Sequence, residues 1–272
     1  MLQKIEATVK YIQEKTKFNG KIAVILGSGL GNFADLIEAE HVLNYKDIPN
    51  FPISTVEGHS GQLIFGKFRG KSIVAMKGRF HYYEGYSMKE VTFPIRVFGK
   101  LGVTNLLVSN AAGGINYDFE VGDVMMITDH INLFGTNPLI GKNENEFGPR
   151  FPDMSKAYHP ELCETARSFA RSNNIRLHEG VYVGLTGPSF ETRAEYRFLN
   201  TIGGDAVGMS TVPEVIVANH MSMKVFGMSV ITNNGLAIPE EGNQHNEVLD
   251  IANLAAPKLE AIFGHLIENI EE

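Results

Sequence analysis

The chain has 272 residues, of which 43% are hydrophobic and 20% are charged, as is typical of a globular protein with a substantial core. Its formal net charge of -7 argues against a nucleic-acid partner, because such proteins usually carry a basic face. A single cysteine, Cys163, excludes an internal disulfide. With neither a signal-peptide core nor a long apolar run in the sequence, we expect a cytoplasmic protein with no membrane partner.

Helical and strand patterns alternate along the first part of the chain. Apolar residues at helical spacing predict a helix over 2–16, and the apolar run KIAVILG predicts a buried strand over 21–27. The segments QLIFGKF and SIVAMKG, separated by a short turn, predict a β-hairpin. Ser87 and Glu90 form a capping-box pattern ahead of a helix in which Pro94 predicts a kink.

The same alternation continues to the C-terminus. Buried strands are predicted over 105–110 and 123–131, and a long irregular loop over 134–158 is typical of a functional segment. The later elements are predicted as helix 160–173, strand 180–186, helix 192–202, strand 205–209, helix 211–222, strand 224–232 and helix 246–270. Thr211 and Glu214 match a capping box at the start of their helix.

No linker or repeat interrupts this pattern, so we expect one domain over residues 1–272. The predicted class is α/β, with a mostly parallel or mixed central sheet flanked by helices. Small-residue loops at 27–31 and 109–114 each follow a predicted strand, and loops at strand ends can converge on one crevice. Their backbone amides suit an anion, although each loop alone is equally typical of a tight turn.

The segment KGRFHYYEGYS, residues 77–87, places cations, a histidine and tyrosines directly after a predicted strand. In an extended segment Arg79, His81 and Tyr83 would face the same way and line one wall. Guanidinium and imidazole groups donate hydrogen bonds to anions. Taken singly, Arg79 would pair with a surface carboxylate and His81 would be a structural loop residue, but their combination with two glycine loops favours an anion site.

A series of motifs resembles the trimeric purine nucleoside phosphorylases. The motifs follow the family's order across roughly residues 20–250 and are GSGLG, EGHSGQL, GRFHYYEGY, SNAAGG, RFPDMS, GPSFET, DAVGMSTVPEVIVA and ITN. The resemblance implies a pentosyltransferase of purine salvage, with the nucleoside phosphorylase fold, that cleaves 6-oxopurine (2′-deoxy)ribonucleosides such as inosine and guanosine. Inorganic phosphate is then a co-substrate that yields the base and (2-deoxy)ribose 1-phosphate, with no cofactor and no metal.

The resemblance also assigns roles to residues. It places phosphate among Ser28, His59, Arg79, His81, Ala111 and Ser210. It places the nucleoside against Tyr83, Phe190, Glu191, Met209, Asn233 and His245, together with Phe151 from a neighbouring subunit of a homotrimer. His81, Glu191 and Asn233 are the catalytic residues in this assignment, in which Glu191 accepts from purine N1–H and Asn233 contacts O6 and N7.

Some of these roles have alternatives. His59 is either a gate over the phosphate or a turn residue, and His245 either contacts the ribose 5′-hydroxyl or faces solvent. Phe151 either reaches a neighbouring subunit or anchors its loop in its own core. Lys77 stands where relatives commonly have glutamine, and either assists phosphate binding or is solvated.

Two other functions remain open from the sequence. The 5′-methylthioadenosine phosphorylases share the fold but carry aspartate at the position of Asn233, so Asn233 and His245 disfavour that activity. A non-catalytic nucleoside-binding protein would be expected to lack some of Arg79, His81, Glu191 and Asn233, and all of them are present.

Overall fold

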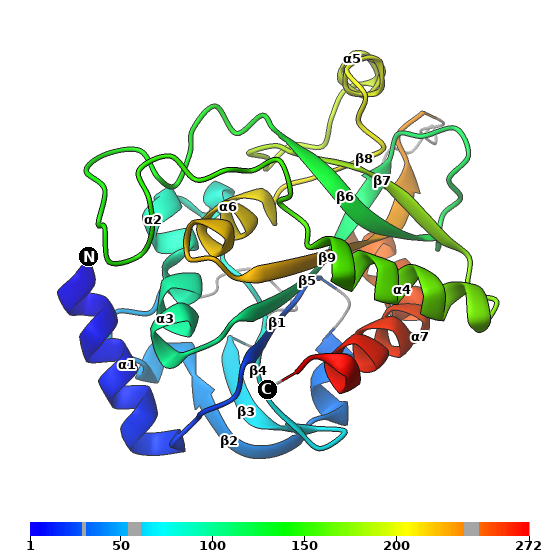
Figure 1. Cartoon of the computed structure of the whole chain (residues 1–272). Helices are drawn as coiled ribbons and strands as arrows, with labels where there is room; N and C mark the ends of the chain where they lie inside the picture. The colour runs from blue at the N-terminus through cyan, green and yellow to red at the C-terminus, as the bar shows by residue number, and fades with distance from the viewer. Residues whose placement is uncertain (29–30, 54–60, 237–244, 272) are drawn as a thin grey trace.

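A mixed nine-stranded sheet forms the centre of the computed structural model, which describes residues 1–28, 31–53, 61–236 and 245–271 (Figure 1). The strand order is β2-β3-β4-β1-β5-β8-β7-β6-β9, and an additional pairing joins β5 to β9. The strands are β1 (Ile22–Leu26), β2 (Glu38–Asn44), β3 (Gln62–Phe68), β4 (Lys71–Lys77), β5 (Asn105–Gly114), β6 (Val124–Asn132), β7 (Leu177–Gly184), β8 (Ala206–Gly208) and β9 (Lys224–Asn234).

Helices cover both faces of this sheet, as the α/β prediction requires. The α-helices are α1 (Leu2–Thr16), α2 (Met88–Val91), α3 (Phe93–Leu101), α4 (Pro160–Ser172), α5 (Arg193–Thr201), α6 (Val212–His220) and α7 (His245–Asn269). Helices α1, α3 and α6 pack together on one side, α4 packs on α7 on the other, and α5 projects away from the sheet (Figure 1). No helix in the described part is long and apolar enough to cross a bilayer.

The pattern of side chains explains the core elements. Ile5 and Ile12 bury the inner face of α1, and Lys17 ends this helix in a left-handed conformation. Every residue of β1 is buried because parallel neighbours and helices enclose it. The β3–β4 hairpin is confirmed, and Arg69 and Gly70 in its turn both have positive φ.

Three details differ from the sequence prediction. Pro94 does not kink one helix; it lies in the first turn of α3, after α2 has ended, where a missing N–H costs nothing. The segment 109–114 is not a loop, because β5 continues to Gly114 by pairing with β8 and β9. The edge strand β2, which the sequence analysis missed, has largely exposed side chains and therefore lacks an apolar pattern.

The predicted capping box at the start of α6 is also wrong. Thr211 makes no side-chain cap hydrogen bond and has a φ of 71°, which is strained for a β-branched residue. Asn110 Nδ2 instead donates to the Thr211 hydroxyl at 2.9 Å. Glu214 turns away from the helix end and bonds to Arg79. Long-range polar contacts therefore replace the local cap.

Candidate active site

A cavity of about 310 Å³ opens where β1, β4, β8 and β9 end, with β5 crossing its floor. Most of the side chains that the sequence analysis assigned to the site line it: Ser28, Arg79, His81, Tyr83, Ala111, Phe190, Glu191, Met209, Ser210 and Asn233. The carboxyl ends of parallel strands are the usual position of a ligand site in an open α/β sheet.

Three of the predicted residues are not found in this cavity. His59 lies outside the described residues. His245 begins α7, but its side chain lies outside the described part. Phe151 lies in the long loop, is 86% exposed and lines a separate, more open depression.

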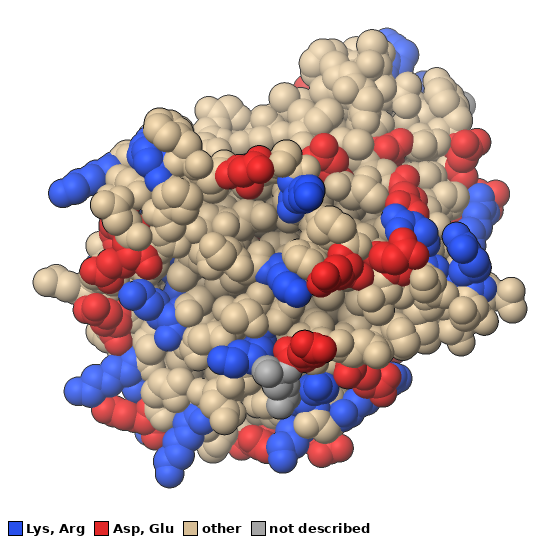
Figure 2. Space-filling view, in the orientation of Figure 1, with Lys and Arg blue, Asp and Glu red and all other residues tan. Residues whose placement is uncertain are grey.

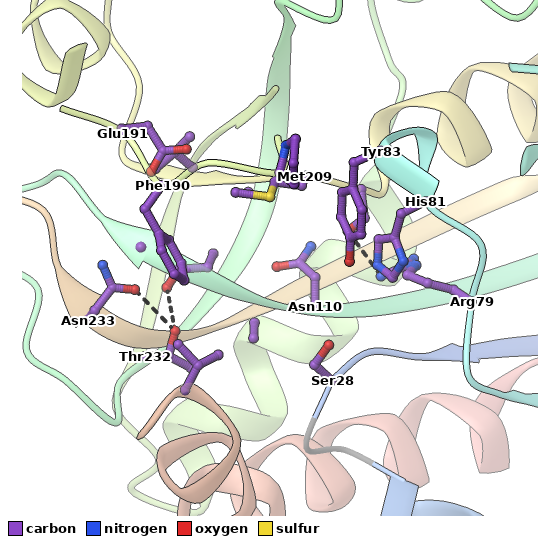
Figure 3. Close-up of a pocket in the computed structure, with 18 of the residues that line it drawn as sticks. Ser28, Arg79, His81, Tyr83, Asn110, Phe190, Glu191, Met209, Thr232 and Asn233 are labelled. Carbon is purple, nitrogen blue, oxygen red and sulfur yellow. Dashed lines mark hydrogen bonds between the residues drawn. The ribbon is translucent and has the colours of Figure 1, made fainter. Parts of the chain in front are cut away.

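The cavity has two chemically different ends (Figure 3). Arg79, His81 and Ser28 lie together at one end, where cationic and hydroxyl groups suit an anion. Glu191, Phe190 and Asn233 lie at the other end, where an apolar ring is combined with a carboxylate and an amide. Tyr83 lies beside His81, and Met209 and Asn110 lie between the two ends.

Arg79 is fixed in a buried position, with 2% of its surface exposed. Its Nη1 donates to the Ser109 carbonyl at 2.7 Å and to Ser210 Oγ at 3.2 Å. Its Nε donates to Glu214 Oε1 at 3.0 Å. The alternative that Arg79 only pairs with a carboxylate on the surface is therefore excluded.

His81 is also buried and is held by a neighbouring carboxylate. Its backbone N–H and its Nδ1 both lie within hydrogen-bonding distance of Glu84 Oε1, at 2.7 Å and 3.1 Å. Because a carboxylate accepts, Nδ1 carries the proton. In the neutral ring Nε2 is then a hydrogen-bond acceptor. Burial lowers the pKa of His81, and the nearby Arg79 guanidinium lowers it further, although the bond to Glu84 opposes both effects.

The route of the chain through residues 79–83 differs from the extended segment that the sequence suggested. His81 is extended, but Tyr83 lies in a short 3-10 helix over Tyr82–Glu84. The His81 and Tyr83 rings stack with centroids 4.7 Å apart, and both still line the cavity. Burial raises the pKa of Tyr83 to about 12, so its hydroxyl stays protonated and can donate.

The end of the cavity with Glu191, Phe190 and Asn233 carries both a donor and an acceptor. Thr232 Oγ1 donates to Asn233 Oδ1 at 3.3 Å, and Asn233 Nδ2 is buried with no hydrogen-bond partner among the described residues. A side chain at Gly113 would lie 3.1 Å from that nitrogen, so the glycine leaves it accessible. Burial raises the pKa of the Glu191 carboxyl, with hydrogen bonds opposing the shift.

Several lining residues were missed by the sequence analysis. Asn110, which is 2% exposed, has its Oδ1 buried with no hydrogen-bond partner in the described part, and its amide nitrogen is held by Thr211. Glu84, which holds the His81 ring but does not line the cavity, was also missed; its position three residues after His81 offered a sequence signal, since a carboxylate at this spacing can orient the ring. Asn110 offered only its place in the SNAAGG motif.

Lys77 has a specific partner. Its Nζ lies 2.9 Å from Asp35 Oδ1, and its side chain is 25% exposed. It does not line the cavity. Lys77 therefore links the end of β4 to the 3-10 helix Gly31–Leu36 that follows the first glycine loop.

Known proteins match nearly the whole chain. Residues 21–268 match the phosphorylase superfamily. Purine nucleoside phosphorylase 1 of Bacillus subtilis (strain 168) is 54% identical over 99% of this chain and 98% of its own length. Purine nucleoside phosphorylase of Mus musculus is 50% identical over 97% of this chain and 94% of its own length.

Solved structures of purine nucleoside phosphorylases also superpose on this chain. Isoform 2 of purine nucleoside phosphorylase from Schistosoma mansoni, in complex with cytosine and ribose-1-phosphate, superposes with a TM-score of 0.94 at 43% identity. That match covers 99% of this chain and 97% of the Schistosoma chain. A Schistosoma purine nucleoside phosphorylase in complex with hypoxanthine gives the same TM-score at 42% identity, covering 100% of this chain and 98% of its own. The chain therefore belongs to the purine nucleoside phosphorylase family and is an enzyme with that activity.

Proposed function

We propose that this enzyme phosphorolyses 6-oxopurine nucleosides, such as inosine and guanosine and their 2′-deoxy forms, in the cavity described above. The proposal rests on one observation: the same cavity has Arg79, His81 and Ser28 at one end, which suit an anion, and Glu191 and Asn233 at the other. Purine N1–H and the 2-amino group donate to an ionised Glu191. The Asn233 amide donates to O6 or N7, and Phe190 covers the ring.

Phosphate occupies the opposite end in this proposal. Arg79, Ser28 and Ser210 surround it with donors, the amide of Ala111 adds a backbone donor, and Nε2 of the neutral His81 ring accepts from the hydroxyl of hydrogen phosphate. Phosphate carries close to two negative charges and strong acceptor oxygens, so these groups bind it and replace its water. His59 and His245 complete the assignment, the first over the phosphate and the second at the ribose 5′-hydroxyl.

The reaction follows from this arrangement. The bond from C1′ to N9 lengthens first, which leaves an oxocarbenium-like sugar and a purine that carries negative charge. Asn233 stabilises that charge as it develops, the kind of electrostatic contribution that lowers barriers most. Phosphate below C1′ stabilises the cation and then attacks it, forming ribose 1-phosphate while the purine leaves with the N9 electron pair.

The complete site requires a second copy of the chain in this proposal. Phe151 is 86% exposed, so it is not anchored in its own core. A homotrimer in which Phe151 covers the ribose of the neighbouring site gives this exposed ring a buried position.

We also propose that residues 1–272 act as one domain in the cytoplasm with no nucleic-acid partner. The face in Figure 2 supports the last point, because acidic and basic side chains are interspersed over it and the described residues form no continuous basic patch there.

The deciding experiment incubates the enzyme with inosine, with and without inorganic phosphate, and follows free hypoxanthine. Release of hypoxanthine should require phosphate and should yield an equal amount of ribose 1-phosphate. Release without phosphate would instead indicate a hydrolase. Efficient cleavage of 5′-methylthioadenosine with no cleavage of inosine would indicate the methylthioadenosine class.

A further inference from the structure

The first turn of α6 contains a buried acidic residue that the reaction scheme does not use. Glu214 is 3% exposed, and a buried carboxylate is costly unless it is paired with a positive group. Its local sequence suggests a helix cap, but the cap does not form. Its Oε1 accepts from Arg79 Nε at 3.0 Å, across 135 residues of sequence.

The guanidinium of Arg79 is held on two sides. Nε is directed at Glu214, while Nη1 is directed at the Ser109 carbonyl and at Ser210 Oγ. A planar guanidinium with donors bound along two edges has lost rotation about its terminal bonds. Glu214 is the only carboxylate among these three partners, so its bond is the one that joins two opposite charges.

We infer that Glu214 is a positioning residue for phosphate, which holds the guanidinium of Arg79 at the orientation that the anion requires. This inference rests on the proposed phosphate site. Ser210 lies two residues before α6 and also contacts Arg79, so this part of the chain supplies both a hydroxyl for the anion and the carboxylate that orients the arginine. Thr211, which has a strained φ of 71°, lies in the chain between Ser210, which bonds to Nη1, and Glu214, which bonds to Nε.

Steady-state kinetics of Glu214→Ala test this role. The phosphate KM should rise roughly tenfold or more, because truncating one partner of a buried, hydrogen-bonded charge pair is costly. The inosine KM should change by less than about threefold, because Glu214 does not line the cavity in which the nucleoside is proposed to bind. Glu214→Gln, which keeps an acceptor for Nε, should recover part of the loss.

A matched control separates this role from helix capping. Glu90 also lies in the first turn of a helix, α2, where it forms a capping box with Ser87 and bonds to no arginine among the described residues. Glu90→Ala should leave the phosphate KM unchanged. Equal effects of Glu90→Ala and Glu214→Ala would overturn the inference, as would parallel rises in the phosphate and inosine KM values.

Chemical rescue gives a readout that a merely structural carboxylate would not alter. In Arg79→Ala, added guanidinium ion, well below denaturing concentrations, should occupy the vacated space against Glu214 and restore part of the activity. The double variant Arg79→Ala, Glu214→Ala should show no rescue, whereas Arg79→Ala, Glu90→Ala should show it. Rescue that is equal in all three variants would contradict the inference.

The same variants distinguish this inference from the phosphate site on which it rests. A phosphate KM that is unchanged in Arg79→Ala would remove the phosphate-site assignment and the inference together. A raised phosphate KM in Arg79→Ala with an unchanged value in Glu214→Ala would leave the phosphate site standing and overturn only the positioning role.

Discussion

At the scale of single residues, burial decides which side chains can act. Arg79 and His81 belong to types that usually face solvent, yet here they are 2% and 6% exposed. Each is held by a carboxylate, Glu214 for the arginine and Glu84 for the histidine. Glu191 at the other end has its carboxyl pKa raised by burial, so it takes up a proton at a higher pH than an ordinary glutamate does.

This pKa shift predicts the acidic limb of the pH–rate profile. Protonation of Glu191 removes the acceptor for purine N1–H, so kcat/KM for inosine should fall at a pH above the ordinary glutamate value of 4.5. In Glu191→Gln the activity should be low and this limb should be missing. An acidic limb that persists in Glu191→Gln would assign it to another group.

The same shift predicts an effect on stability with a definite sign. A raised pKa means that ionisation is unfavourable in the folded state, so this contribution to stability is complete below the unfolded pKa and is lost as the pH rises through the folded pKa. Glu191→Gln should therefore raise the Tm at pH 7 but not at pH 4. Glu195→Gln is the control, because bonds to Thr192 lower the pKa of Glu195 and no gain at pH 7 is expected. Equal shifts at both pH values would contradict the prediction.

Asn233 is expected to set the choice of base. Adenine N1 is an acceptor, so an ionised Glu191 would face it with no shared proton. Sites built to hydrogen-bond a substrate group discriminate by roughly 10⁴ or more when that group is absent, so adenosine should be a very poor substrate. Asn233→Asp should raise adenosine turnover relative to inosine, because a carboxylate accepts from the 6-amino group. Competition assays measure the ratio of the two kcat/KM values. Equal efficiencies in the unmutated enzyme would overturn the 6-oxopurine selectivity, and an unchanged ratio in Asn233→Asp would overturn this role for Asn233.

At the scale of elements, the end of the cavity with Glu191 and Asn233 depends on a contact between the end of β9 and helix α5. Tyr196 of α5 is 1% exposed and lines the cavity. A side chain at Gly235, just after β9, would lie 2.3 Å from the Tyr196 ring. Because Asn233 is on β9 and Glu191 precedes α5, this contact keeps the two recognition groups at a fixed separation.

Gly235→Ala should therefore disturb base recognition more than phosphate binding. The added methyl group overpacks the contact at a cost of about 1–3 kcal/mol and displaces α5. The inosine KM should rise about tenfold, while the phosphate KM changes little. Gly264→Ala is the control, since the atoms nearest to the new methyl group belong to the flexible end of Arg69. Equal rises in the inosine and phosphate KM values in Gly235→Ala would show that the contact between Gly235 and Tyr196 has no specific effect on base recognition.

At the scale of the whole molecule, the exposed long loop points to assembly. Phe151 and Ile140 are 86% and 61% exposed, and both line an open depression with His130 and Arg150. Large apolar side chains that gather on a surface are typical of an interface between chains. A cyclic trimer would cover them through head-to-tail contacts that complete each site with one neighbour.

Subunit mixing tests this assembly. Arg79→Ala and Phe151→Ala protomers are dissociated, mixed and reassembled. If Phe151 acts across the interface, some sites in mixed trimers contain both native residues, and activity should exceed that of either parent. The controls are each variant reassembled alone and a native mass measurement of the mixture. Activity equal to the plain average of the parents, or a native mass of one protomer, would show that each site is built within a single chain.

The sequence by itself determined the alternation of strands and helices and the chemical types at the site. Apolar runs such as that of β1 and the β3–β4 hairpin pattern are local, so they were predicted correctly. The motifs around Arg79 and Asn233 likewise identified the family, because long motifs in a fixed order are specific.

Tertiary structure decided the remainder, where local preference and long-range contact compete. Glu214 matches a capping box locally, but a buried guanidinium requires a counter-charge, and that requirement prevails. Gly113 and Gly114 resemble a loop, yet pairing with two strands that come much later in the chain extends β5 through them. Such outcomes depend on partners about a hundred residues away, which no local pattern encodes.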